Sequence, residues 1–165
     1  MKNWIRPIKD LGACEEALGW AEGYRTLDEA WAKCERGDWM LWLLGNLSGP
    51  PESDSRKKLV LAACQCARLA LPYVLAGELR PLRAIETAES WAKGEGNITL
   101  ADVRKAANDV YAAHAAAYAT YAAHAAAYAA YAANDAYAAH AAAQQSTLKK
   151  CADIVRVQSP TITLD

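Results

Sequence analysis

Hydrophobic residues recur at helical spacing along most of the chain. Between residues 10 and 22 the apolar positions follow one another at intervals of three and four: Leu11, Cys14, Leu18 and Ala21. Alternation with a period of two, as in a β-strand, occurs only in the short stretch 161–164. The pattern therefore predicts an all-α fold, a compact bundle of several helices.

Capping residues divide the first part of this pattern into separate helices. Thr26 and Glu29 have the spacing of a capping box, which predicts a helix over residues 27–36. Asp38 is then placed to cap a helix over residues 39–44. Short helices joined by tight turns are expected here.

The following helices have equally clear signals. Residues 58–71 are apolar nearly all round, which predicts a buried central helix. Pro81 suits the first turn of another helix, and Gly94 suits its end. Thr99 and Asp102 offer the start of a third.

The next segment is unusually rich in alanine. Residues 106–143 contain 23 Ala in 38 positions, so their helix propensity is very high. We expect residues 99–155 to form one long helix or two helices that meet at Asn134–Asp135, followed by a tail over residues 156–165. The whole chain, residues 1–165, is predicted to form a single helical domain.

Tyrosine and histidine repeat every ten residues within the alanine-rich segment. The repeat comprises Tyr111, His114 and Tyr118, then Tyr121, His124 and Tyr128; a degraded copy starts with Tyr131 and Asn134, and Tyr137 with His140 restarts the spacing. Each triple falls within about 60° of a helix surface. The rings are therefore either core wedges between closely packed helices or the lining of a cleft for a planar ligand or a partner helix.

Two arginines extend this candidate binding site. Arg68 is the only charge between Leu59 and Leu71, so it needs a partner if it is buried, or it extends to solvent at the edge of the bundle. Arg83 could bind a phosphate, although with Glu86 and Glu89 it has the spacing of an ordinary solvated helix face.

Composition excludes several classes of function. A formal net charge of −1 disfavours nucleic-acid binding, and the charged N-terminal residues disfavour a secretory signal or membrane insertion. The five cysteines form no CxxC motif and are expected to be reduced thiols of a cytoplasmic protein. No catalytic motif, metal-ligand spacing or cofactor motif occurs, so we expect neither an enzyme nor a bound cofactor.

Ordered motifs along almost the whole chain resemble a family of immunity proteins. These proteins occur beside polymorphic toxins in bacteria and as small orphan genes in phages. The similar stretches are residues 13–20, 30–31, 34–42 (CERGDWMLW), 59–64 (LVLAAC), 84–91, the Ala/Tyr tract and 151–156 (CADIVR). The resemblance implies an all-α fold and a role in bacterial or phage conflict.

These observations predict a non-catalytic binding protein that neutralises its target by stoichiometric capture. In the leading interpretation it is an immunity-type inhibitor of a protein toxin. In the alternative it is a phage counter-defence protein that sequesters a small nucleotide-derived signal molecule. A structural helical protein without a ligand is the third interpretation, and a homodimer is compatible with all three because helices rich in small residues can pair with their own copy.

The two readings of the Tyr/His repeat can be separated by mutation. We expect Tyr118→Ala and His124→Ala to weaken partner binding and to leave the helix content unchanged, because alanine favours helix. Far-UV circular dichroism and a binding assay are the measurements. Loss of the far-UV signal in the double variant would instead show that the rings are core wedges.

Overall fold

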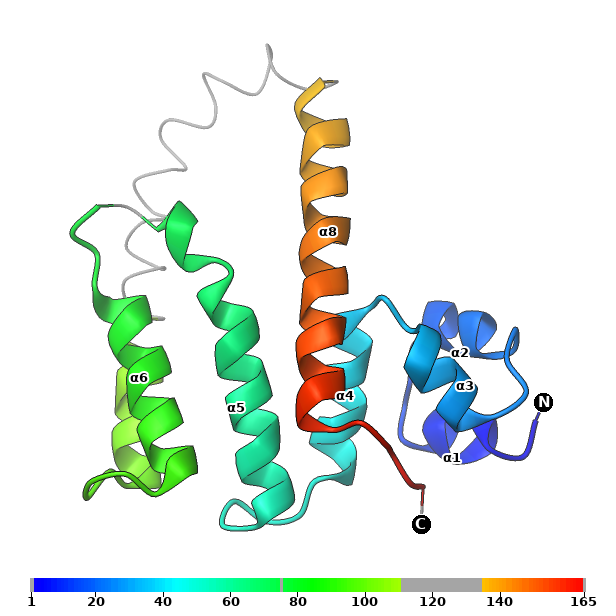
Figure 1. Cartoon of the computed structure of the whole chain (residues 1–165), viewed down its shortest axis with the longest axis horizontal. Coiled ribbons are helices and arrows are strands. Elements are labelled where there is room, and N and C mark those ends of the chain that lie inside the picture. Colours follow the sequence, from blue (N-terminus) through cyan, green and yellow to red (C-terminus); the bar gives the residue numbers. More distant parts are fainter. Residues whose placement is uncertain (1, 75, 111–134, 165) are drawn as a thin grey trace. The chain divides into compact units, whose positions relative to one another are not determined.

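The computed structural model describes residues 2–74, 76–110 and 135–164, with side chains in these ranges except at Tyr73 and residues 135–143. Every regular element in this part of the chain is helical (Figure 1), which confirms the all-α prediction. Residues 100–110 are also helical. The labelled elements are α1 (Ile5–Asp10), α2 (Glu15–Ala21), α3 (Leu27–Lys33), α4 (Gly37–Leu47), α5 (Asp54–Arg68), the 3-10 turn η1 (Leu71–Tyr73), α6 (Arg80–Lys93) and α8 (Asp135–Gln158).

Contacts along the chain group it into two units. The first comprises Met1–Cys66 and Thr147–Asp165, and thus holds α1 to α4, most of α5 and the last part of α8. The second comprises Ala67–Ser146 and holds η1, α6 and the helical residues 100–110. The expectation of a single domain stays a prediction.

Thr26 caps the start of α3 as predicted, while Glu29 reaches back to Arg25 and not to Thr26. The Thr26 hydroxyl accepts a hydrogen bond from the Glu29 backbone N–H at 3.2 Å, and the Glu29 carboxylate accepts one from the Arg25 backbone N–H at 2.9 Å. The helix ends at Lys33, three residues earlier than expected, because Cys34 adopts an extended backbone. Local capping chemistry therefore predicted the start of this helix better than its end.

The expected cap of the next helix is wrong. α4 begins at Gly37, and Arg36 takes the N-cap position, so Asp38 lies within the first turn. The Asp38 carboxylate accepts two hydrogen bonds from the Arg36 guanidinium, at 2.9 and 2.8 Å. The Asp38 side chain, which the sequence predicted as a cap, therefore pairs with Arg36.

In the second unit, α6 and the helical residues 100–110 begin where the sequence predicts. Pro81 lies in the first turn of α6, and Gly94 ends that helix in the left-handed conformation with φ = 71°. The Thr99 hydroxyl accepts from the Asp102 backbone N–H at 3.3 Å, and the Asp102 carboxylate accepts from the Thr99 N–H at 2.8 Å. This reciprocal cap precedes the helical residues 100–110.

The predicted all-round burial of α5 is wrong. Ala62 and Cys64 are its buried residues, whereas Ala63 and Gln65 between and beside them are exposed. A helix at the edge of a packed unit needs only one buried stripe. The apolar composition of this helix therefore overstated how much of its surface is covered.

The last helix supplies much of the core of the first unit. Ala152 and Val155 of α8 are completely buried, and they pack in one cluster with Trp31, Met40 and Ala62. α8 continues to Gln158, so the first residues of the expected tail are helical. Whether the alanine-rich segment forms one helix or two depends on residues 111–134, which lie outside the described part of the chain.

Two contacts join α8 to the ends of α3 and α4. The Arg156 guanidinium donates to the backbone carbonyls of Trp31, at 3.2 Å, and Cys34, at 2.6 Å, and so caps the C-terminus of α3. The first residue of α4, Gly37, lies against α8 so closely that an added Cβ would be 2.7 Å from the Ala152 nitrogen and 2.8 Å from the Cys151 carbonyl carbon. Only glycine fits this position without moving backbone.

We therefore expect Gly37→Ala to lower the free energy of unfolding by about 1–3 kcal/mol, because the new methyl group clashes with the backbone of α8. Gly45→Ala in the same helix is the matched control. An added Cβ there meets only Leu59, at 4.0 Å, so this change should be neutral or stabilise by up to ~1 kcal/mol. Urea denaturation measures both variants, and equal stabilities would contradict the close α4–α8 contact.

Candidate functional site

Most of the predicted binding residues lie outside the described part of the chain. His140 belongs to α8, but its side chain is not described. The predicted roles of the repeat therefore stay predictions for the residues in the undescribed segment: Tyr111, His114, Tyr118, Tyr121, His124, Tyr128, Tyr131 and Asn134.

Arg68, the first of the two candidate arginines, forms an ion pair with Glu89 of α6. Its Nε and Nη2 atoms donate to the two carboxylate oxygens of Glu89 at 2.8 and 2.7 Å. The Arg68 side chain is 39% exposed and that of Glu89 only 15%, so the expectation that Glu89 belongs to a solvated face is wrong. The Arg68 guanidinium lowers the pKa of Glu89. The arginine thus has the partner it needs and has an intramolecular role.

Arg83 lies in an open groove between α6 and the helical residues 100–110. Positive and negative side chains line this groove together, with Arg80 and Lys105 beside Asp102 and Asp109. Arg80 also forms an ion pair with Glu78. Three cations and two carboxylates line the groove, so a phosphate there would compete with carboxylates for the same cations.

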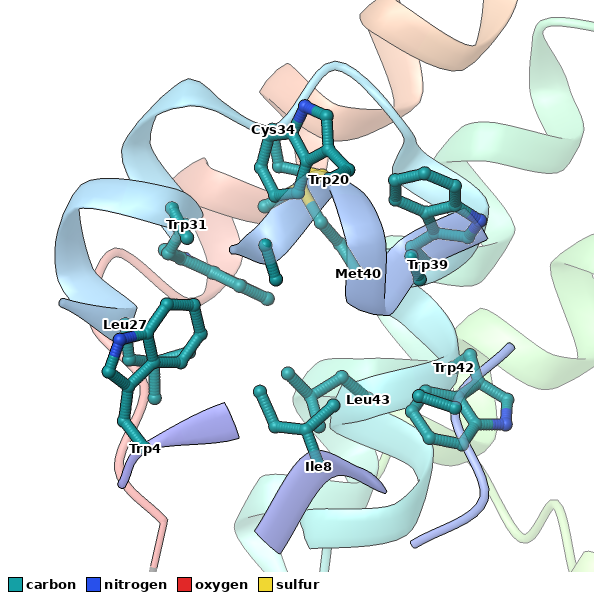
Figure 2. A pocket seen from close by; sticks show the side chains of 14 residues that line it. Trp4, Ile8, Trp20, Leu27, Trp31, Cys34, Trp39, Met40, Trp42 and Leu43 are labelled. Atoms are coloured by element: carbon teal, nitrogen blue, oxygen red, sulfur yellow. The ribbon is translucent and has the colours of Figure 1, made fainter. Parts of the chain in front are cut away.

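A pocket in the first unit has a more distinctive composition. Five of the six tryptophans line it, and Figure 2 shows apolar side chains from four helices arranged around one central space. Its tryptophans are Trp4, Trp20, Trp31, Trp39 and Trp42. This concentration of aromatic surface makes the tryptophan pocket our candidate functional site.

Each helix contributes through residues three or four positions apart. Trp4 immediately precedes α1 and Ile8 lies within it, Ala17 and Trp20 belong to α2, and most of the remaining wall comes from α3 and α4. Residues at this spacing share one helix face. Four short amphipathic helices that turn their apolar faces inward therefore generate the pocket.

Hydrogen bonds hold two of the indole rings. The Trp4 Nε1 atom donates to the Arg25 carbonyl at 2.9 Å, and the Trp31 Nε1 atom donates to the Ser159 carbonyl at 3.0 Å. Trp31 is buried, whereas Trp42 on the opposite side is exposed. The pocket thus has a rigid wall at Trp31 and an accessible edge at Trp42.

The accessible edge combines aromatic rings with charge. The Trp39 ring lies edge-on to Trp20, with centroids 5.9 Å apart, and the Arg36 guanidinium lies over Trp39 at 4.1 Å. Arg36 also binds Glu16 at 2.8 Å. The two hydrogen bonds that Arg36 donates to the Asp38 carboxylate are the largest cause of the lowered pKa of Asp38. The rim is therefore preorganised and charged.

The size of the pocket limits what can enter it. Its cavity volume is about 60 Å³, whereas pockets for drug-sized ligands measure roughly 300–1,000 Å³. A single apolar side chain fits such a space, but a nucleotide does not. The pocket is suited to anchoring one residue of a larger molecule.

Sequence reasoning missed this site, although a signal for it was present. Five of the six tryptophans occur within the first 42 residues, three of them in or beside the motif at residues 34–42. Tryptophan is a frequent anchor in binding surfaces. The Tyr/His repeat is the more conspicuous pattern, and the sequence prediction placed the candidate site there.

Comparisons with known proteins give no independent assignment. No family model matches the chain, and neither the curated proteins nor the solved structures include a significant match. Among the described helices none is both long and apolar enough to cross a membrane. The described residues also contain no group of three or more potential metal ligands.

The Arg68–Glu89 pair predicts a pH dependence of stability. The folded-state pKa of Glu89 lies below its usual value of 4.5, so the pair stabilises the fold above that pH and is lost as pH falls through the folded value. Glu89→Gln should lower the free energy of unfolding at pH 7 by about 1 kcal/mol, and this difference should shrink below pH 4.5.

Denaturation at several pH values measures this effect. Glu86→Gln is the matched control, because Glu86 lies exposed on the same helix; it should change stability by less than about 0.5 kcal/mol. A pH-independent difference between wild type and Glu89→Gln would contradict a stabilising ion pair.

Proposed function

We propose that this protein is a non-catalytic binding protein that captures a protein partner through the tryptophan pocket. The observation that carries the proposal is the convergence of five tryptophans from α1 to α4 on one small apolar space. Aromatic anchors around a desolvated pocket, surrounded by polar residues, are typical of the energetic centre of protein interfaces.

The size of the pocket favours a protein over a small molecule. A cavity of about 60 Å³ accommodates one side chain, which gains affinity only when the rest of the partner covers the rim. The alternative, sequestration of a nucleotide-like molecule, would need unpaired cations. Arg68 pairs with Glu89, Arg80 pairs with Glu78, and Arg83 lies among charges of both signs. These features favour protein capture.

The surroundings of two thiols, those of Cys34 and Cys66, fit a role without catalysis. Cys34 is buried, and burial raises its pKa. Burial and a hydrogen bond with Cys151 raise the pKa of Cys66 to about 12. A thiol that stays protonated at neutral pH is a poor nucleophile. These cysteines are suited to packing, in keeping with a stoichiometric mode of action.

The resemblance to immunity proteins suggests which partner to test first. A toxin neutralised by a covering helical surface requires about 800 Å² of contact on each protein. The face formed by α1 to α4 would provide the anchor pocket for such a contact. We therefore propose neutralisation of a protein toxin in bacterial or phage conflict as the biological role.

Native mass spectrometry of tagged protein recovered from cells that carry a toxin is the direct test. An added mass the size of a protein supports capture of a protein. An added mass of a few hundred daltons overturns it in favour of sequestration. A bare monomer or homodimer in every condition argues against both forms of capture.

A pocket-filling variant tests the site itself. Ala17 lines the pocket, so Ala17→Leu places extra carbon atoms in the space that a partner side chain would occupy. We expect it to weaken binding of the captured partner about tenfold or more, as measured by titration calorimetry.

The matched control adds the same group elsewhere on the first unit. Ala32 is exposed on α3 and does not line the pocket, so Ala32→Leu should leave binding unchanged. Thermal denaturation checks that both variants are folded. Equal affinities of two folded variants would place the interface away from the pocket.

A further inference from the structure

The edge of the tryptophan pocket carries a clear charge asymmetry. Residues 10–24 supply Ala13, Ala17, Trp20 and Ala21 to the pocket. The same stretch contains four carboxylates, at Asp10, Glu15, Glu16 and Glu22, and no lysine or arginine. Lys2 lies at the end of α2, where its Nζ atom donates to the Glu22 carbonyl at 2.6 Å, so the acidic part of this edge is the start of α2, at Glu15 and Glu16.

Most of this charge is exposed to solvent. The Glu16 side chain is 71% exposed, and Glu15 and Glu22 are exposed as well. Arg36 is the cation that pairs with this edge, and it bonds both Glu16 and Asp38. One guanidinium between two carboxylates leaves a net negative charge in the cluster.

The acidic cluster and the apolar pocket form one continuous surface. A second depression of about 370 Å³, lined by Glu16, Arg36 and Asp38, shares Trp39 and Trp42 with the tryptophan pocket. A residue of a partner that enters the pocket would therefore place its neighbours beside these carboxylates. Charge complementarity at such a rim determines which partners associate.

We infer that the tryptophan pocket binds a basic protein segment, in which an aliphatic side chain enters the pocket and an adjacent lysine or arginine pairs with the carboxylates of α2. This inference rests on the proposed function, and it adds the chemistry of the partner. The surface already binds one guanidinium in this way, because that of Arg36 stacks on Trp39 and pairs with Glu16. A second cation could pair with the exposed carboxylate of Glu16, which lines the depression, and Glu15 adds negative charge one residue away.

Selection from a phage-displayed library of random peptides on the immobilised full-length protein tests both the pocket-based function and the preference for a basic segment. The Ala17→Leu protein, whose pocket is filled, serves as the counter-selection target. We expect the peptides specific to wild type to combine an aliphatic residue with neighbouring lysine or arginine. Their affinity should fall with added salt, as expected for charges at a rim.

Charge-neutralising variants then test the selected peptides. Glu15→Gln with Glu16→Gln should weaken binding of a basic peptide about fivefold and reduce its salt dependence. Glu52→Gln with Asp54→Asn is the matched control, since it removes the same charge near the start of α5, outside the pocket lining. The control should leave binding unchanged.

The outcomes separate the two proposals. Pocket-dependent peptides with an aliphatic residue but without basic neighbours, or equal effects of the two double variants, would overturn the inference and leave the proposed function standing. Enrichment of acidic peptides would do the same. If no peptide distinguishes wild type from folded Ala17→Leu, both the inference and the pocket-based function fail.

Discussion

The guanidinium of Arg156 is the contact on which the architecture of the first unit depends. It binds the last carbonyls of α3 from a position near the end of α8, more than a hundred residues later in the chain. Backbone carbonyls at a helix end need partners when they are covered. The cation supplies them and so fixes α3, with its Trp31 ring, against α8.

Close packing beside this contact determines the path of α4. Gly37 brings the start of α4 against the backbone at Cys151 and Ala152, and Met40 and Leu43 then enter the core. Trp39 and Trp42 belong to the same helix and form the accessible side of the pocket. The site and the core are therefore coupled through α4, and displacement of its first turn would change both.

The charged residues fall into two groups, those paired within the protein and those exposed to solvent. Arg156 and Arg68 have hydrogen-bonded partners within the protein and serve its stability. The carboxylates of α2 remain exposed beside an apolar space and are available to a partner. In the proposed binding surface an apolar centre lies beside a charged rim, an arrangement that favours selectivity and fast association.

Local chemistry determined which segments are helical and where several of them begin. Thr26 with Glu29, Pro81, Gly94, and Thr99 with Asp102 act through near neighbours, so sequence alone predicted them. Even the alternation at residues 161–164 is real, since Ile162 is buried between exposed threonines, although no strand forms among the described residues. Tertiary structure decided the ion pair of Glu89 with Arg68, which residues of α5 are buried and the convergence of five tryptophans, because each depends on residues that are distant in sequence and meet only after packing.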